Sequence, residues 1–308
     1  MRALACLMGV VNRSISFTWP VFQENLIRPL EQECDHVHLY VFNHDTGDAP
    51  VDGVVLEGNV RDKIPADVIE EVRQADVDVI IDNKCTPACE FRQDYSETHK
   101  RNAMRQLHTE FMVGTYVERV ADQFDVVVVC TADARLARPL NMKHVQDAVA
   151  SNTVYTSEVN NADGYTNGFY VGPPRALLPV LKRYLDFESA DYDYEYTVKK
   201  AFDMHGIQHA FTDMVFWKIR ANGAVFWPSK RTSFLEDAEA ARMHELYESD
   251  VKSTEAMTPL QLVEHTVCSG PAGAPMLPLL LVLLVVVVAL TGLAGWTLWC
   301  QRCRTNVA

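Results

Sequence analysis

The sequence predicts an α/β fold, a mixed β-sheet flanked by helices in a Rossmann-like order, followed by a transmembrane helix. Two observations predict it. Short apolar strand-like runs alternate with helical patterns as far as about residue 230. A long uncharged run, residues 276–299, follows near the C-terminus. The chain of 308 residues, with 48% hydrophobic and 22% charged residues, is large enough to bury a substantial core.

Seven short apolar runs are expected to form strands, because each has the length of a strand and ends at turn residues or charges. The runs are Leu4–Val11, Val37–Phe42, Val54–Leu56, Val77–Ile81, Val126–Cys130, Thr153–Thr156 and Gly168–Val171. The first of them starts close to Met1 and has no small-residue cleavage site after it. We therefore interpret it as a strand and not as a signal peptide.

Helical patterns fall between several of these runs. Apolar residues recur at spacings of three and four residues over Trp19–Leu30, with Pro20 near the start, and over Met104–Val117. A third helix is expected to open at Pro173-Pro174, and a fourth to run from Tyr194 to His205 and stop at Gly206. Proline at the start and glycine just past the end are the usual asymmetry of helix termini.

The stretch Phe211–Trp227 allows two interpretations, a short helix or a hairpin around Asn222-Gly223. Asn-Gly is a strong signal for a tight turn, so the dipeptide favours the hairpin.

The C-terminal part divides into three segments after a globular domain of residues 1–235. Residues 236–275 are an acidic segment and a Gly/Pro-rich stalk, 276–299 the predicted transmembrane helix, and 300–308 a short tail. A helix of residues 276–299 rises about 36 Å, enough to cross a hydrocarbon core of about 30 Å. Trp296 and Trp299 lie where an interfacial aromatic belt is expected.

A polar site is predicted where the run Val126–Cys130 ends in Thr131-Ala132-Asp133. A buried strand that delivers a carboxylate at its C-terminal end is typical of ligand sites in α/β sheets. A loop rich in Asp, Asn and Gly, residues 160–172, follows it in the sequence. Together they suggest a sugar-nucleotide site. Asp133 could equally cap the turn before Arg135, since Asp is a common turn residue.

A resemblance to a known family rests on four motifs. They are Met8-Gly9-Val-Val-Asn12-Arg13, Thr18-Trp19-Pro20, Asp163-Gly-Tyr-Thr-Asn-Gly-Phe-Tyr-Val-Gly172 and Lys218-Ile-Arg-Ala-Asn-Gly223. Over about residues 1 to 230 the chain resembles GT-A-type glycosyltransferase-like proteins of algae and large DNA viruses. The resemblance implies a GT-A-like sheet.

The resemblance also implies a donor site. The first loop, with Gly9 and Arg13, would contact the nucleotide diphosphate. Asn43 and Asp45, at the end of the second strand, would approach the base, and Asp133 would hold ribose or a metal. A departing nucleoside diphosphate needs neutralising charge from a cation or from arginine.

The metal-binding motif of that family is incomplete here. The Asp-x-Asp of metal-dependent GT-A enzymes reads Thr131-Ala132-Asp133, so one carboxylate is missing. Mn²⁺ or Mg²⁺ is the expected cofactor of the family, with Asp133 as its tentative ligand. A hard cation that keeps several waters can be held by few protein oxygens.

Catalytic and acceptor roles fall on the second half of the domain. Asp163 and Glu195 are candidate bases for an inverting reaction, and Asn167 and Gly168 belong to a candidate acceptor loop. The alternatives are a plain turn at Asp163-Gly164 and a solvated helix start before Glu195.

The function expected from these features is a membrane-anchored glycosyltransferase. It would move a sugar from a nucleotide-sugar donor to an acceptor hydroxyl on a glycan, protein or lipid. The alternative is a non-catalytic, membrane-tethered adaptor of the same fold that binds a sugar or nucleotide. A net charge of −13 disfavours nucleic acid as a partner.

The topology signals conflict. The absence of a signal peptide favours a single-pass C-terminal anchor with a cytosolic domain. Arg302 and Arg304 follow the apolar span and favour the opposite, lumenal placement of the domain. Cys6 and Cys130, inside apolar strands, are expected to be buried free thiols of a reducing compartment, so we expect the cytosolic orientation.

Overall fold

The computed structural model describes residues 1–56, 58–84, 96–159, 164–185, 194–223 and 225–226. Residues 236–275, the apolar span 276–299 and the tail lie outside this part. Among the helices in the described ranges, none has the length and apolarity needed to cross a membrane.

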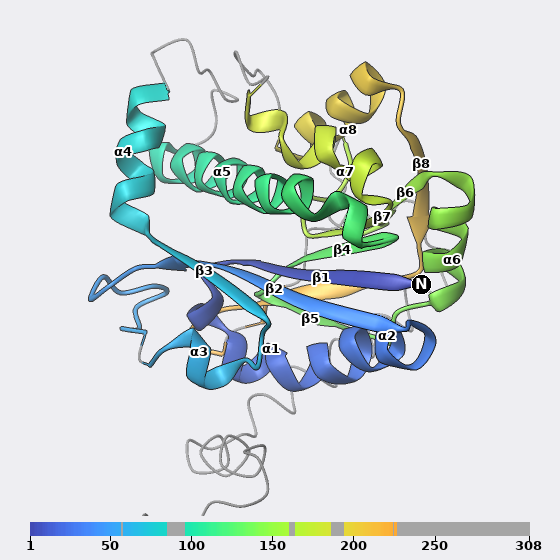
Figure 1. Ribbon diagram of the computed structural model, residues 1–308. Coiled ribbons are helices and arrows are strands. Elements are labelled where there is room, and N and C mark those ends of the chain that lie inside the picture. Colours follow the sequence, from blue (N-terminus) through green and yellow to red (C-terminus); the bar gives the residue numbers. More distant parts are fainter. Residues whose placement is uncertain (57, 85–95, 160–163, 186–193, 224, 227–308) are drawn as a thin grey trace, which may run out of the picture. The chain divides into compact units, whose positions relative to one another are not determined.

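A seven-stranded mixed sheet forms the centre of the domain, in the order β3-β2-β1-β4-β7-β6-β8 (Figure 1). Strand β7 alone runs antiparallel to its neighbours β4 and β6, and the other pairs in the sheet are parallel. The strands are β1 (Arg2–Gly9), β2 (His36–Asp45), β3 (Val68–Arg73), β4 (Val126–Thr131), β6 (Thr153–Ser157), β7 (Phe169–Gly172) and β8 (Gln208–Thr212).

Helices cover both faces of this sheet, which explains why its central strands are apolar throughout. Alternate side chains of β1 and β4 enter two separate cores, Ala3, Ala5 and Leu7 on one face and Leu4, Cys6 and Met8 on the other. The first face packs against α1 (Ile15–Phe22), α2 (Arg28–Glu33) and α6 (Met142–Ser151), and the second against α5 (Glu97–Val120), α7 (Pro174–Leu181) and α8 (Tyr194–His205). Figure 1 shows α5, α7 and α8 above the sheet and α1 and α2 below it. The predicted mixed sheet flanked by helices is confirmed.

A second, three-stranded sheet joins distant parts of the chain, in the order β10-β9-β5. Its strands are β5 (Ala134–Leu136), β9 (Phe216–Ile219) and β10 (Val225–Phe226). Strands β9 and β10 form an antiparallel hairpin, and Gly223 adopts a positive φ of +80° in its turn. The hairpin interpretation of Phe211–Trp227 is therefore confirmed. Because β5 follows directly after β4, this sheet places β9 beside the end of β4.

One predicted strand is wrong, because Val77–Ile81 lies in helix α4 (Gln74–Lys84). Val77 and Ile81 are buried one helical turn apart, whereas Val79 and Ile80 between them are 60% and 46% exposed. A helix explains this burial, since residues four apart share one face. The apolar run resembled a strand only because both faces of the helix carry aliphatic side chains.

Two further corrections concern the edge of the sheet. The predicted strand Val54–Leu56 is reduced to an isolated bridge between Val51 and Val54. The third strand is instead β3, whose two glutamates, Glu70 and Glu71, hid it in the sequence. An edge strand needs only part of its surface buried, so it tolerates such charges.

The expected helices form, with one change. The pattern over Trp19–Leu30 is divided into α1, a π-helical turn (Gln23–Ile27) and α2. Pro20 lies inside α1, not near its start. Short helical or 3-10 segments complete the described part: η1 (Val11–Arg13), α3 (Val60–Lys63), η3 (Ala121–Gln123) and η4 (Arg183–Leu185). Cys6 and Cys130 are buried free thiols as predicted, and burial raises the pKa of both.

Candidate functional site

A cleft of about 850 Å³ opens at the carboxyl ends of the central strands. Met8 and Gly9 at the end of β1, His44 in β2 and Thr131 in β4 line it. The chain passes from β1 to β2 on one side and later places β4 on the other side of β1. The cleft therefore lies at the switch point of the sheet, where open α/β sheets bind their ligands.

The loop after β1 brings Arg13 into the cleft. Gly9 has a φ of +118°, which side-chain-bearing residues rarely adopt, so the sharp exit from β1 requires glycine. The buried Asn43 then fixes the loop: its Oδ1 accepts a hydrogen bond from the Val11 amide at 2.9 Å, and its Nδ2 donates to Glu71 at 2.7 Å. Asn43 thus fixes the loop that carries Arg13.

Arg13 lies between two carboxylates. Its Nε and Nη2 donate to Asp52 at 2.7 and 2.8 Å, and its Nη1 lies 3.6 Å from Oδ2 of Asp133. Asp52 also accepts from the Ala221 amide at 3.0 Å, so it joins Arg13 to the turn after β9. The bidentate bond to Arg13 lowers the pKa of Asp52 to about 2.

Arg220 approaches the same carboxylate from the other side. Its Nη1 lies 3.9 Å from Oδ2 of Asp133. Burial and the positive charge of Arg13 lower the pKa of Arg220. The pKa of Arg13 is raised instead, because its interactions with Asp52 and Asp133 outweigh the effect of burial. Two guanidinium groups are therefore crowded around one carboxylate that is 13% exposed.

The turn Thr131-Ala132-Asp133 is held through its backbone. The Ala132 amide donates to Met8 and the Ile219 amide to the carbonyl of Asp133, both at 2.9 Å. In the described residues the Asp133 side chain bonds no backbone amide and faces the two arginines, which argues against the turn-capping interpretation. The Thr131 hydroxyl, in a residue 6% exposed, lines the cleft with no hydrogen-bond partner in that part of the chain.

Strand β9 contributes two more cleft residues, Lys218 and the following Arg220. Within the described ranges the Lys218 side chain forms no hydrogen bond or ion pair, while its backbone pairs with Ala134. Lys218 thus brings a positive charge next to the Thr131–Asp133 turn.

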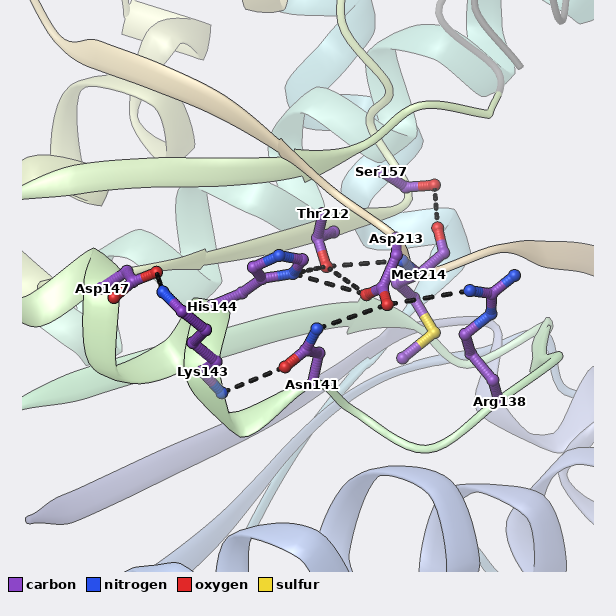
Figure 2. A network of polar contacts seen from close by, with 9 residues as sticks. All are labelled: Arg138, Asn141, Lys143, His144, Asp147, Ser157, Thr212, Asp213 and Met214. Carbon is purple, nitrogen blue, oxygen red and sulfur yellow. Dashed lines mark hydrogen bonds and ion pairs between the residues drawn. The ribbon is translucent and has the colours of Figure 1, made fainter. Parts of the chain in front are cut away.

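A polar network around Asp213 holds the connection from β8 to β9 (Figure 2). Asp213 lies 3.4 Å from Nδ1 of His144 and 3.7 Å from Nη1 of Arg138, and accepts from Asn141 at 3.3 Å. The Ser157 hydroxyl donates to the Met214 carbonyl at 2.6 Å. These contacts tie the connection to the start of α6 and the end of β6, so β9 is fixed where it enters the small sheet.

The opposite wall comes from α5, α8 and the loop before β7. Asn167 and Glu195 line the cleft there, with the start of α5, whose Ser96 caps the first turn by accepting from the His99 amide at 3.2 Å. Gly164 packs so closely on α8 that an added Cβ would lie 2.0 Å from the Glu195 carbonyl oxygen. The Tyr165 amide donates to that oxygen at 3.0 Å. The loop therefore sets the position of Glu195.

The structure brings together part of the predicted site. Five predicted residues line the cleft: Gly9, Arg13, Asp133, Asn167 and Glu195. Asn43 and Asp45 do not; Asn43 supports the first loop, and Asp45 accepts from the Gly47 amide at 2.9 Å. Gly168 packs under the ring of Phe216, and Asp163 lies outside the described residues. The donor, acceptor, catalytic and metal-binding roles of all nine predicted positions, Asp133 included, stay predictions.

The residues present fit a resident metal poorly. In the described ranges no three His, Cys, Asp or Glu side chains gather closely enough to hold an ion. Asp133 is engaged by two guanidinium groups, and Thr131 occupies the first position of the Asp-x-Asp motif, where a carboxylate is missing.

Four cleft residues were given no role by the sequence pattern: Asp52, Thr131, Lys218 and Arg220. Lys218 and Arg220 belong to one of the motifs noted above, so a signal existed for them. Asp52 had none, because its loop reaches the cleft only through long-range contacts to Arg13 and Ala221.

Comparison with known proteins identifies no family. No protein-family model matches the chain. No curated protein matches it either. Among solved structures it has a likeness to mouse xyloside xylosyltransferase 1 in its apo form, with a TM-score of 0.38 and 7% sequence identity, over 69% of this chain and 86% of that one. A likeness at this level does not establish a shared fold or function.

Proposed function

We propose that the chain is a glycosyltransferase that moves a sugar from a nucleoside-diphosphate sugar to an acceptor hydroxyl. The observation that carries the proposal is the cleft at the β1–β4 switch point, which Arg13, Lys218 and Arg220 line. A cationic site at the carboxyl ends of parallel strands suits an anionic nucleotide. The motif resemblance to GT-A-type proteins supports the same ligand.

The site divides the reactants between its two walls. The diphosphate lies over Arg13, Lys218 and Arg220, where cationic donors stabilise the charge that develops on the leaving group. Asp133 contacts the ribose and keeps the two arginines apart. The acceptor enters from the side of Asn167 and Glu195.

Glu195 is the proposed base, with Asp163 as the second candidate. In an inverting transfer the acceptor oxygen attacks the anomeric carbon and its proton passes to the carboxylate. The bond between that carbon and the diphosphate oxygen breaks, and the electron pair leaves with the nucleoside diphosphate. The contact of Gly164 and Tyr165 with the Glu195 backbone supports a fixed base.

The membrane anchor is part of the proposal. Residues 276–299 cross the bilayer once, and the domain faces the cytosol. Protease protection on sealed membranes tests this: a domain that resists digestion until detergent is added would reverse the orientation. Release of the chain by alkaline carbonate would remove the anchor from the account.

A non-catalytic adaptor is the second candidate, favoured by one observation. Asp133 is already ion-paired on both sides, as expected of a binding site without a metal-assisted reaction. Such an adaptor would bind nucleotide sugars without consuming them.

Nucleotide release separates the two candidates. The full-length chain, purified in detergent, is incubated with a panel of UDP-, GDP- and ADP-sugars, with and without Mn²⁺. An enzyme releases the free nucleotide from one donor, through transfer or slow hydrolysis. Binding without release supports the adaptor, and failure to bind any donor rejects both candidates.

A further inference from the structure

We propose that Arg13, Lys218 and Arg220 neutralise the donor's diphosphate in place of a divalent cation, so that donor binding needs no metal. This inference rests on the proposed function, because it states how the same cleft holds its ligand. It concerns side chains that the sequence motifs left without a role, Lys218 and Arg220.

The carboxylates on this wall of the cleft are already used. Asp52 is bonded bidentately by Arg13 and accepts the Ala221 amide. Asp133 faces Arg13 at 3.6 Å and Arg220 at 3.9 Å. Mg²⁺ and Mn²⁺ prefer anionic oxygen ligands, and an ion at Asp133 would lie beside two guanidinium groups of like charge.

Among the described residues that line the cleft around the Thr131–Asp133 turn, in contrast, cations exceed carboxylates. Arg13, Arg220 and Lys218 are opposed there by Asp52 and Asp133. The Asp52 carboxylate accepts a hydrogen bond from the Ala221 amide, and β9 pairs with β5. These contacts fix the backbone that carries Lys218 and Arg220 before a ligand arrives. A diphosphate would supply the missing negative charge through short, charge-assisted hydrogen bonds.

The Thr131 hydroxyl provides an independent pointer to a ligand. It is buried, lines the cleft and has no partner among the described residues. Buried hydroxyl groups normally have a hydrogen-bond partner. A phosphate oxygen accepts a hydrogen bond from a hydroxyl, whereas a metal ion at this position would gain only a neutral hydroxyl oxygen in place of the anionic carboxylate of Asp-x-Asp.

The chemistry is balanced without a metal. The bond from the anomeric carbon to the diphosphate oxygen breaks, and the acceptor oxygen forms the new bond and loses its proton to the base. The electron pair departs on the diphosphate, whose added charge is met by N–H donors of the two arginines and the lysine.

The test is calorimetry on the full-length protein in detergent, with inorganic pyrophosphate, UDP and GDP as probes, in EDTA and in Mn²⁺. Pyrophosphate and one nucleotide should bind in EDTA, with a Kd within about threefold of that in Mn²⁺. Lys218→Met should weaken pyrophosphate binding at least about tenfold, in keeping with one lost hydrogen bond to a charged group. Lys143→Met, at an exposed lysine on α6, is the matched control and should bind as the parent does.

A reciprocal variant sharpens the result. Thr131→Asp places a second carboxylate at the turn, so it should weaken pyrophosphate binding in EDTA and make the remaining binding depend on Mn²⁺. Circular dichroism checks that each variant is folded.

The outcomes are distinct. Binding that occurs only with Mn²⁺, or that Lys218→Met and Arg220→Gln leave unchanged, overturns the metal-free site but leaves a nucleotide-dependent transferase in place. If neither pyrophosphate nor any nucleotide binds under either condition, the metal-free site and the proposed function both fail.

Discussion

Two charged clusters of the same domain differ in burial and in the balance of their charges. The first surrounds Glu110 on α5 and Arg183 in η4, which are 0% and 4% exposed and ion-paired to each other. Glu110 also accepts hydrogen bonds from the hydroxyls of Tyr170 and Tyr194, and Arg183 donates to Thr197. The second is the cleft cluster of Arg13, Asp52, Asp133 and Arg220, with the nearby Lys218.

The difference separates structure from binding. In the Glu110 cluster one carboxylate and one guanidinium group neutralise each other's charge and link α5, β7, η4 and α8, and Nη2 of Arg183 has no hydrogen-bond partner among the described residues. In the cleft, the two arginines lie 3.6 and 3.9 Å from Asp133, beyond normal hydrogen-bond length. Among the described residues of this cluster, the three cations Arg13, Lys218 and Arg220 face two carboxylates, Asp52 and Asp133. A closed, balanced cluster holds a fold together; an open, unbalanced one is ready for a ligand.

The largest effect is expected where the closed cluster is broken. Arg183→Met should lower the free energy of unfolding by about 3–5 kcal/mol, because it leaves the Glu110 charge buried without its partner. Denaturant unfolding measures it. The double variant Glu110→Leu with Arg183→Met removes both charges and should recover part of the loss. A single-variant loss below about 1 kcal/mol would mean that the cluster is not closed.

The cleft should respond in the opposite way. Asp133→Asn should reduce donor turnover about 100-fold or more while changing the free energy of unfolding by less than about 1 kcal/mol. The physical reason is that its charge orients two guanidinium groups at the ligand and supports no core contact. Nucleotide-release assays and denaturant unfolding check the two halves. Normal turnover in a folded variant would remove Asp133 from the site.

A smaller loss is expected for Arg13. Arg13→Ala should weaken nucleoside diphosphate binding by about 1.5–3 kcal/mol, the range for a hydrogen bond to a charged group. Arg175→Ala, at an exposed arginine that pairs only with Asp122 in the described ranges, serves as the control. If calorimetry finds the same nucleoside diphosphate affinity in the parent and in Arg13→Ala, Arg13 only pairs with Asp52 and does not contact the ligand.

The last expected effect concerns pH. Burial, with the charges of His108 and Arg105, lowers the pKa of His44 from 6.5 to about 4. The unfolded chain therefore binds a proton at His44 before the folded chain does, and stability should fall as the pH drops from about 6.5 to about 4. His44→Gln should flatten that part of the stability curve. An equally steep curve in the variant would locate the acid sensitivity elsewhere, for example at His209, whose pKa burial also lowers to about 4.

The sequence predicted the parts of the fold that burial dictates. Strands β1 and β4 are covered on both faces, so their continuous apolar runs predicted them clearly. The Asn222-Gly223 dipeptide predicted the turn of the β9–β10 hairpin. It failed where one element is half-exposed. Helix α4 carries aliphatic residues on its solvent face and was taken for a strand, and the edge strand β3 carries charges and was missed.

The sequence predicted five of the residues that line the cleft: Gly9, Arg13, Asp133, Asn167 and Glu195. Gly9 and Asp133 follow directly from the ends of β1 and β4. Asp52 reaches the cleft through contacts across 39 residues to Arg13 and 169 residues to Ala221, which no local pattern encodes. Asn43 was expected to touch the donor because it ends β2, yet its amide is used to hold the first loop.

Ligand footprinting by hydrogen–deuterium exchange tests the central claim, that the cleft at the β1–β4 switch point is the nucleotide-sugar site. The full-length chain is exchanged with and without each member of the UDP-, GDP- and ADP-sugar panel. For one donor, exchange should slow in peptides that contain Gly9 to Arg13, Thr131 to Ala134 and Lys218 to Ala221, while peptides around Glu110 and Arg183 stay unchanged. Slower exchange confined to another part of the chain, or no change with any donor, would contradict the account.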